Sequence, residues 1–588
     1  MMSADVDGAV RGFAREAGAP GEAAVPLRAA PPASSYRWLR HHAETRPDTP
    51  AVAEWRDGTR GPWLTYSAAF QTVGEVARGL NGLGVQAGDR VVLALPNGIP
   101  FFCAVIACIG AGAMAVPAPV PGVARSAAFL ERIKGILADC GPALVITETA
   151  AREPIAQITE GRCPAVSYQS VRDAGDGAGQ APPLEPESSV ALLQYTSGST
   201  GRPRGLVVTH ESLAAACAQA AQAYAERADD VGVTWVPLYH DLGLNTGVMR
   251  PLFSGYPSVL LRPEEFARQP VTWLEAMDAC RGTVSSGPNF AYDLCARKVE
   301  PERAAELDLS SWRVARNGGE VVRAETVDRF GAHFASAGFP AQAMCPTYGL
   351  AEATLTVTTC TPDVRPRRLH VLRSDFQRGV VTPVDGPAGP GLPAVPLLSS
   401  GVPLPGTSVR AGEGDSRVGP ISIRGPQLAA GHWGDTGVSR DRKHTGDGWY
   451  DTGDLGFVYD GHLFIVGRAD DTIVYHGSNF YLSDIVAACA KITLLRPGRL
   501  APFVVQNEDN GSDEVCVVAE LRPGEQPDAG TLARLAVQTK QCLASALELY
   551  VSRVAFVAPG ALPVTTSGKV RASEVKRRFA SGHLPVLA

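Results

Sequence analysis

The sequence lacks several features that would assign it to common functional classes. Its twelve cysteines include no Cys-x-x-Cys pair and no cysteine–histidine spacing typical of a metal site. Reduced thiols in a cytoplasmic protein are therefore expected. The formal net charge is only −6, from 54 basic and 60 acidic residues. This balance argues against nonspecific nucleic-acid binding, which needs a basic face.

A long membrane-spanning run is also missing. The first residues do not combine a basic segment with an apolar one, so no secretory signal is expected. The most apolar stretch, residues 101–116, carries no charge but is shorter than the roughly 20 residues of a membrane helix. It also contains Gly110 and Gly112. We interpret it as a buried helix and strand of an α/β core.

The chain has 588 residues, 45% of them hydrophobic and 19% charged, which is typical of a globular protein with room for about two to four domains. Strand-like runs at 90–97, 143–147 and 205–210 alternate with helix-like runs at 70–83, 129–140 and 211–227. Such alternation predicts parallel strands and an α/β fold. We expect a flexible leader at 1–33, a large domain at 34–468 with a β-rich later part, a loop-rich insertion at about 365–404, and a small α+β domain at 469–588.

A glycine- and hydroxyl-rich loop follows the strand-like run at 190–195, in the sequence LLQYTSGSTGRPRG (192–205). Glycine lets the backbone approach an anion, and hydroxyls and N–H groups donate hydrogen bonds to it. The loop matches neither a Walker A motif nor GxGxxG. From composition alone, an ordinary polar surface loop is an equal alternative. The candidate phosphate ligands are Thr196, Ser197, Gly198, Ser199, Thr200 and Gly201.

The word YTSGSTGRPRG resembles the phosphate loop of the adenylate-forming superfamily, which includes acyl-CoA synthetases, peptide-synthetase adenylation domains, luciferases and fatty acyl-AMP ligases. That loop usually ends in Pro-Lys-Gly, whereas Arg204 replaces the lysine here. The resemblance extends over about residues 34–579. It implies ATP-dependent conversion of a carboxylic acid to acyl-AMP with release of pyrophosphate, assisted by Mg²⁺.

Two further words, NGGE and PTYGLAE, carry candidates for nucleotide binding. The first places open backbone where a purine can lie, although a simple turn is the alternative. In the resembling family, the position of Tyr348 stacks on adenine, and that of Glu352 helps to bind Mg²⁺ together with Thr200. A solvated helix start is the alternative for the glutamate. The candidates are Asn317, Gly318, Gly319, Glu320, Thr347, Tyr348 and Gly349.

Three motifs near the C-terminus complete the resemblance. YDTGDLG offers Asp454 as an acceptor for ribose hydroxyls, and VGRADD offers Arg468 as a second ribose or phosphate ligand. Asp470 stands at the family's domain hinge. LPVTTSGKVR places Lys569 at the position of the catalytic lysine that bridges the carboxylate and the α-phosphate. Structural turn residues and an inert surface lysine are the alternatives.

The middle of the chain resembles fatty acyl-AMP ligases most closely, in the segments 236–244, 285–295, 317–330, 348–358 and 369–406. The last segment matches an insertion thought to restrict the domain motion that CoA requires. Such enzymes pass the acyl group to the phosphopantetheine thiol of an acyl carrier protein, here expected in trans. The candidate acyl-pocket residues are His240, Gly247, Ser286, Asn289 and Phe290.

Several alternatives stay open. His240 either gates the pocket or is simply a buried histidine whose hydrogen bonds are made within the core. Asp241 is interpreted as structural. Ser286 departs from the usual glycine and is expected to narrow or polarise the acyl pocket, which keeps acids other than a plain long-chain fatty acid as candidate substrates. Ser478 and Leu482 depart from the usual motif beside the hinge. An acyl-CoA synthetase, a ligase of an unusual carboxylic or amino acid, and a non-catalytic nucleotide-binding homologue are the other candidate functions.

Overall fold

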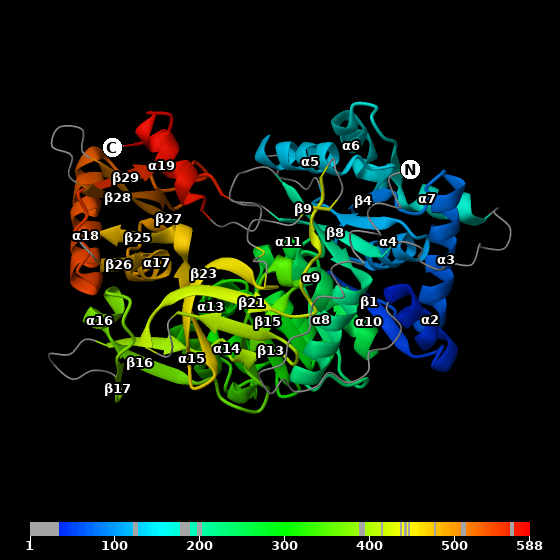
Figure 1. Ribbon diagram of the computed structural model, residues 1–588, viewed down its shortest axis with the longest axis horizontal. Helices are drawn as coiled ribbons and strands as arrows, with labels where there is room; N and C mark the ends of the chain where they lie inside the picture. Colours follow the sequence, from blue (N-terminus) through cyan, green and yellow to red (C-terminus); the bar gives the residue numbers. More distant parts are fainter. Residues whose placement is uncertain are drawn as a thin grey trace.

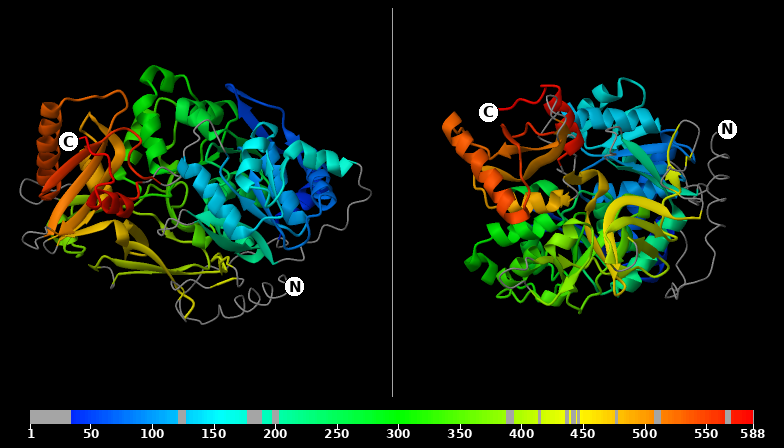
Figure 2. Two further views of the ribbon diagram at one scale, coloured as in Figure 1. Left: turned by 90° about the horizontal axis from the view of Figure 1, so that it is seen from above. Right: turned by 60° about the vertical axis from the view of Figure 1, so that its left-hand side comes forward.

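The computed structural model describes residues 34–120, 127–176, 189–196, 203–386, 394–412, 416–434, 438–439, 444, 447–475, 478–506, 513–564 and 570–587. The N-terminal elements and the C-terminal elements lie at opposite ends of the molecule (Figure 1), and the two turned views in Figure 2 agree with this arrangement. The sheets and helices confirm the predicted mixed α/β class.

The first large sheet carries the strand that leads into the glycine-rich loop. Its order is β22-β9-β8-β5-β4-β6-β7, and β5, β4, β6, β7 and β8 pair in parallel. β8 and β9 pair antiparallel, so the glycine-rich loop joins the two strands of a hairpin. The strands are β4 (Arg90–Ala94), β5 (Met114–Pro117), β6 (Leu144–Thr147), β7 (Ala165–Ser167), β8 (Val190–Thr196), β9 (Arg204–Thr209) and β22 (Gly431–His432).

The apolar stretch at 101–116 forms a buried helix and strand, as predicted. The helix α4 (Ile99–Gly110) is buried from Phe101 to its last residue, and β5 follows it. Among the described residues, no helix is both long enough and apolar enough to span a membrane. The other helices of this half are α2 (Ser35–Thr45), α3 (Tyr66–Gly82), α5 (Ala127–Cys140), α6 (Arg152–Thr159) and α7 (Tyr168–Asp176).

The second large sheet has the order β19-β15-β14-β13-β12-β10-β11-β1-β2, with β3 beside β1. Strands β10 to β14 pair in parallel, so their carboxyl ends meet at one edge. Helix α8 (His210–Ala223) lies between the two sheets, since Leu213 packs in the core of the first and Ala220 in that of the second. The strands are β1 (Pro50–Arg56), β2 (Thr59–Arg60), β3 (Leu64–Thr65), β10 (Gly232–Thr234), β11 (Ser258–Leu260), β12 (Val284–Gly287), β13 (Val314–Asn317), β14 (Met344–Gly349), β15 (Thr356–Thr359) and β19 (Val402–Pro403).

Short helices connect the strands of this sheet. They are α9 (Asp241–Leu244), the π-helix η2 (Asn245–Met249), α10 (Arg250–Ser254), α11 (Pro263–Arg268), α12 (Val271–Ala279), α13 (Asn289–Lys298), α14 (Pro301–Ala305) and α15 (Ala324–His333). A π-helix is rare in proteins and frequently marks a functional site.

The predicted loop-rich insertion is wrong in part. Residues 368–398 contain a three-stranded antiparallel sheet of order β17-β16-β18 with a short helix. Next to it lies the expected β-rich part, an antiparallel sheet of order β20-β21-β23-β24. The elements are β16 (Arg368–Leu372), α16 (Arg373–Gln377), β17 (Pro383–Val384), β18 (Ala394–Leu398), β20 (Ser408–Ala411), β21 (Gly419–Arg424), β23 (Tyr450–Tyr459) and β24 (His462–Arg468).

The C-terminal residues build a small α+β unit with its own apolar core. It contains the ribbon β25-β26 and the sheet β27-β28-β29. The domain boundary between residues 468 and 469 stays a prediction. The elements are β25 (Thr472–Tyr475), β26 (Ser478–Tyr481), α17 (Leu482–Cys489), β27 (Leu495–Gln506), β28 (Asp513–Leu521), α18 (Ala529–Leu547), β29 (Arg553–Val557) and α19 (Ala572–Ala580).

Candidate active site

Three predicted nucleotide ligands meet although they come from three strands. Asp454 of β23 and Arg468 of β24 are cross-strand partners. The Tyr348 hydroxyl of β14 donates to Asp454 Oδ2 at 2.6 Å, and Arg468 Nε lies 3.4 Å from Asp454 Oδ1. The edge of the second large sheet therefore joins the β23–β24 hairpin at residues that the sequence singled out separately.

Burial and the neighbouring charges determine the protonation states of Tyr348 and Arg468. Burial raises the pKa of Tyr348 well above 10, and the neighbouring Asp454 carboxylate raises it further. The phenol therefore stays neutral and donates. Burial alone would lower the pKa of Arg468, but the carboxylates of Asp454, Asp471 and Glu352 outweigh burial and raise it. Glu352, the predicted Mg²⁺ ligand, thus lies in the electrostatic field of the same arginine.

Glu352 lies in the short 3-10 turn η4 (Ala351–Ala353), and three hydrogen bonds hold this turn and the residue after it in place. That residue, Thr354, has φ +59°, which is a conformational outlier for a β-branched residue. Its hydroxyl donates to the Gln427 carbonyl at 2.7 Å, and its own carbonyl accepts from Asn245 Nδ2 at 3.1 Å. The Ala429 N–H donates to the Glu352 carbonyl. Neither Thr354 nor Asn245 was among the predicted site residues.

The NGGE segment follows the carboxyl end of β13 with two glycines, and the Gly318 N–H donates to the Gly287 carbonyl at 3.2 Å. A Cβ on Gly318 would lie 2.6 Å from the Thr347 carbonyl oxygen, so only glycine fits there. Gly319 has φ +83° and open space beside it. The adjacent Gly349 is equally confined, because a Cβ would lie 1.8 Å from the Leu355 carbonyl oxygen. Gly318 and Gly349 let neighbouring backbone segments approach closely, and Gly319 faces open space. This arrangement is compatible with a planar purine.

The other two residues of this segment are tied to the scaffold. Asn317 is buried at the end of β13. Glu320 Oε1 accepts the backbone N–H of Phe290 at 2.6 Å and so links the segment to the start of α13. Phe290 itself is 47% exposed. An exposed aromatic ring at this edge is available to a ligand.

The phosphate loop is described only at its base. Thr196 ends β8, half-buried, and pairs with Arg204 across the hairpin. Gln194 of the same strand donates to the Tyr239 carbonyl at 2.9 Å, which holds the segment before His240 against this strand. The predicted ligands Ser197, Gly198, Ser199, Thr200 and Gly201 and the predicted catalytic Lys569 lie outside the described residues.

His240 is not the buried histidine that one alternative assumed. Its side chain is 44% exposed, and Nδ1 lies 2.5 Å from Asp241 Oδ1. Asp241 is buried, and the Leu242 N–H donates to its carboxylate at 2.7 Å at the start of α9. The Asp241 backbone carbonyl accepts from Asn245 Nδ2 at 2.9 Å. These contacts agree with a structural Asp241 and leave the His240 ring half-accessible.

The remaining candidate acyl-pocket residues differ in accessibility. A Cβ on Gly247 would lie 2.7 Å from Thr234 Cγ2, so this side of η2 is tightly packed. The Asn289 side chain is buried and satisfied by Thr326 and by the Arg323 N–H. Ser286 is buried, and its register partner on β13 is Arg316. Asp470 is exposed in the turn η6 (Ala469–Asp471), between β24 and the C-terminal unit.

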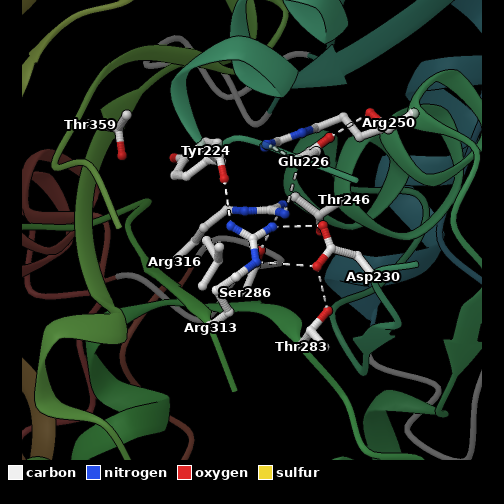
Figure 3. Close-up of polar contacts among 12 residues, drawn as sticks. Tyr224, Glu226, Asp230, Thr246, Arg250, Thr283, Ser286, Arg313, Arg316 and Thr359 are labelled. Carbon is white, nitrogen blue, oxygen red and sulfur yellow. Dashed lines mark hydrogen bonds and ion pairs between the residues drawn. The ribbon is translucent and has the colours of Figure 1, made fainter. Parts of the chain in front are cut away.

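A buried charge cluster behind these strands was missed. Glu226, Arg250 and Arg316 come from three separate segments and meet next to Ser286 (Figure 3). Each residue alone reads as an ordinary surface charge in the sequence.

Comparisons with known proteins bear on this geometry. Residues 39–433 match the AMP-binding enzyme family. The medium-chain-fatty-acid–[acyl-carrier-protein] ligase JamA of Moorena producens is 34% identical over 521 residues, covering 85% of this chain and 87% of that protein. The long-chain-fatty-acid–AMP ligase FadD28 of Mycobacterium tuberculosis is 32% identical, covering 91% and 95%.

The similarity to fatty acyl-adenylate ligases extends to solved structures. A structure from a study of fatty acyl-adenylate ligases of E. coli and L. pneumophila superposes with a TM-score of 0.85 at 30% identity, covering 95% of this chain and 100% of that one. The L. pneumophila fatty acyl-adenylate ligase in complex with acyl adenylate and pyrophosphate superposes with a TM-score of 0.69 at 28% identity. The similarity therefore includes both the large sheets and the C-terminal unit.

Proposed function

Since this chain belongs to the AMP-binding enzyme family and is an adenylate-forming ligase, we propose that it activates a fatty or related carboxylic acid with ATP and loads it onto an acyl carrier protein. The observation that carries this proposal is the convergence of Tyr348, Asp454 and Arg468 beside Glu352. The name of the relative JamA states both a fatty-acid substrate and a carrier-protein acceptor, which supports the choice of both reactants.

In the first step, a carboxylate oxygen of the acid forms a bond to the α-phosphorus of ATP, and the bond to pyrophosphate breaks. Two anions must meet, so positive charge and aligned donors lower the barrier. We assign the open space beside Gly319 and the Tyr348 ring to adenine, and the Asp454 carboxylate to the ribose hydroxyls. Lys569 is the proposed donor at the transferred phosphate.

The described residues fit Mg²⁺ only in part. They contain no group of three or more His, Cys, Asp or Glu side chains placed to hold a metal. Glu352 is an oxygen ligand of the kind that Mg²⁺ prefers, and Mg²⁺ is usually bound by one or two carboxylates plus substrate phosphates. Glu352 and Thr200 are the residues that would hold the ion. When bound, it would offset the negative charge of the phosphates.

The preference for a carrier protein over CoA is supported by contacts of the insertion. The Phe376 ring lies 5.5 Å from the Tyr481 ring, and Gln377 Nε2 donates to the Leu547 carbonyl at 2.8 Å. Outside the insertion, Arg323 contacts the Ser483 carbonyl. These bonds join the large part to the C-terminal unit on the side away from α19 (Figure 1). We propose that they restrict rotation of that unit about Asp470.

An exchange assay tests the proposal directly. A panel of carboxylic acids is scored by ATP–pyrophosphate exchange, and the active acids are then incubated with a phosphopantetheinylated carrier protein or with CoA. Intact-mass measurement is expected to show acyl transfer to the carrier and little acyl-CoA. If no acid of the panel supports exchange, the adenylation proposal is overturned. Efficient acyl-CoA formation would overturn only the choice of acceptor.

A further inference from the structure

The buried cluster behind the candidate acyl pocket contains two guanidiniums and one carboxylate. Glu226 Oε1 accepts from Arg250 Nη2 and from Arg316 Nη2, the latter at 3.1 Å (Figure 3). The other oxygen, Oε2, accepts the Ser254 hydroxyl at 2.7 Å. The side chains of Glu226, Arg250 and Arg316 are 0%, 2% and 4% exposed. Because arginine is always protonated, these three side chains leave one positive charge in the interior.

Several donors of this cluster have no acceptor. Among the described residues, Arg250 Nε and Nη1 and Arg316 Nε form no hydrogen bond. The Tyr224 ring lies 4.7 Å and 4.9 Å from the two guanidinium carbons, which stabilises cations but accepts no directed N–H bond.

The nearby Asp230 does not supply the missing acceptor. Its carboxylate is engaged by Arg313, at 2.6 Å and 3.2 Å, and by the Thr283 hydroxyl at 2.8 Å. A buried charge without a partner is strongly unfavourable, so the cluster favours an anionic ligand.

The position of the cluster relative to the strand ends indicates which ligand can reach it. Arg316 precedes Asn317, the last residue of β13, and lies on the same face of the sheet as its register partner Ser286. Arg316 Nη1 approaches Ser286 Oγ at 3.4 Å. On the other side, the Tyr224 hydroxyl lies 2.9 Å from Thr347 Oγ1. The cluster therefore lies one residue behind the strand ends where we place the acyl group and the nucleotide.

We propose that the acyl pocket ends at Arg316 and Arg250 and that the preferred substrate is an α,ω-dicarboxylic acid, whose second carboxylate pairs with these guanidiniums. This inference rests on the proposed function. A carboxylate supplies the missing charge and matches the planar fork of arginine with two parallel hydrogen bonds. A hydrocarbon terminus would leave the same N–H groups buried and unpaired, at a cost in affinity.

The substrate preference of the unmodified enzyme is the primary test. The value of kcat/KM in pyrophosphate exchange is measured for monocarboxylic acids and for dicarboxylic acids of matched length over a series of chain lengths. We expect the best diacid to exceed its matched monoacid by about 30-fold or more, the size of effect typical of a buried charge pair. A preference for the monoacid at every length overturns the inference but leaves adenylation intact. Activity with neither class overturns both.

Variants give a second readout. Arg316→Met is expected to lower the diacid-to-monoacid ratio of kcat/KM by about 30-fold, and Arg316→Lys to restore part of that ratio. Lys298→Met removes an exposed cation of α13 and serves as the matched control with an unchanged ratio. A thermal melt of each variant checks folding. An equal loss for both acids in Arg316→Met would assign Arg316 to the scaffold and overturn the inference.

Discussion

Asp454 receives two partners, one on each carboxylate oxygen. The Tyr348 hydroxyl donates to Oδ2 at 2.6 Å, and Arg468 Nε lies 3.4 Å from Oδ1. The strands that carry these residues are separated in sequence by about a hundred positions, so the contact depends on the docking of the β23–β24 hairpin against β14. A ribose placed here would meet a carboxylate that is already held in a fixed orientation.

Replacing Asp454 with asparagine tests the role of this carboxylate. Asp454→Asn keeps the shape but removes the charge that accepts two ribose hydroxyls. Because hydrogen bonds to a charged group contribute about 1.5–3 kcal/mol, the KM for ATP should rise by about 10- to 100-fold. Pyrophosphate exchange at varied ATP concentration measures it. The control is Asp460→Asn, an exposed carboxylate of the same hairpin, and an unchanged KM for ATP in Asp454→Asn would refute the assignment.

Lys569 is expected to act in adenylation and not in thioester formation. Lys569→Ala should slow single-turnover formation of acyl-AMP by about 100- to 1,000-fold, the typical effect of losing one donor to a developing charge. Transfer from preformed acyl-AMP to a carrier protein should be retained. Lys576→Ala, on the exposed side of α19, is the matched control. Wild-type pyrophosphate release from Lys569→Ala would favour a different mechanism.

The sequence predicted those parts of the fold that depend on local patterns. The strand predicted at 143–147 is β6 (Leu144–Thr147), and the helix predicted at 129–140 begins only two residues earlier, as α5 (Ala127–Cys140). Alternating apolar residues and helix starts are local signals. The family resemblance is confirmed by the match over residues 39–433. Tyr348, Asp454 and Arg468 were predicted as nucleotide ligands because each lies in a distinctive motif. The structure places the three side chains in contact, and their role stays a prediction.

What the sequence did not reveal depends on contacts between distant segments. The short strands β16 and β18 are stabilised by pairing with each other across a connection of more than twenty residues, so their composition reads as loop. Glu226 and Arg316 are 90 positions apart. Each charged residue alone is most simply read as solvent-exposed. Only the packing of the segment that follows α8 against β13 makes them a buried cluster.

A pH dependence of stability follows from His42, which ties α2 to α10. Its Nε2 lies 2.8 Å from the Leu252 carbonyl, and its Nδ1 faces Arg46 Nη2 at 2.9 Å. The ring is therefore neutral, with the proton on Nε2. Burial, with help from the Arg46 charge, lowers the pKa of His42 to about 4. Because the unfolded value is about 6.5, the stabilisation is present above pH 6.5 and is lost as the pH falls toward 4.

His42→Gln should remove this part of the acid sensitivity. The unfolding free energy of the unmodified protein should fall by about 1–2 kcal/mol more between pH 7 and pH 5 than that of the variant. Urea titrations at the two pH values measure the difference. His210, whose pKa burial also lowers to about 4, remains in both proteins and leaves a common slope. Equal losses in the two proteins would contradict a neutral buried His42.

The contacts of the insertion with the C-terminal unit should control the choice of acceptor. In the double variant Phe376→Ala, Gln377→Ala, the ring contact with Tyr481 and the hydrogen bond to the Leu547 carbonyl are both lost. Removing about 1–2 kcal/mol of contact energy should raise acyl-CoA formation by about tenfold, while acyl transfer to the carrier protein changes little. Intact-mass and thioester assays on the same acyl-AMP measure both products. Gln71→Ala on the exposed face of α3 is the control. If the double variant instead loses carrier transfer and gains no CoA activity, the insertion serves the carrier interaction and does not restrict the domain.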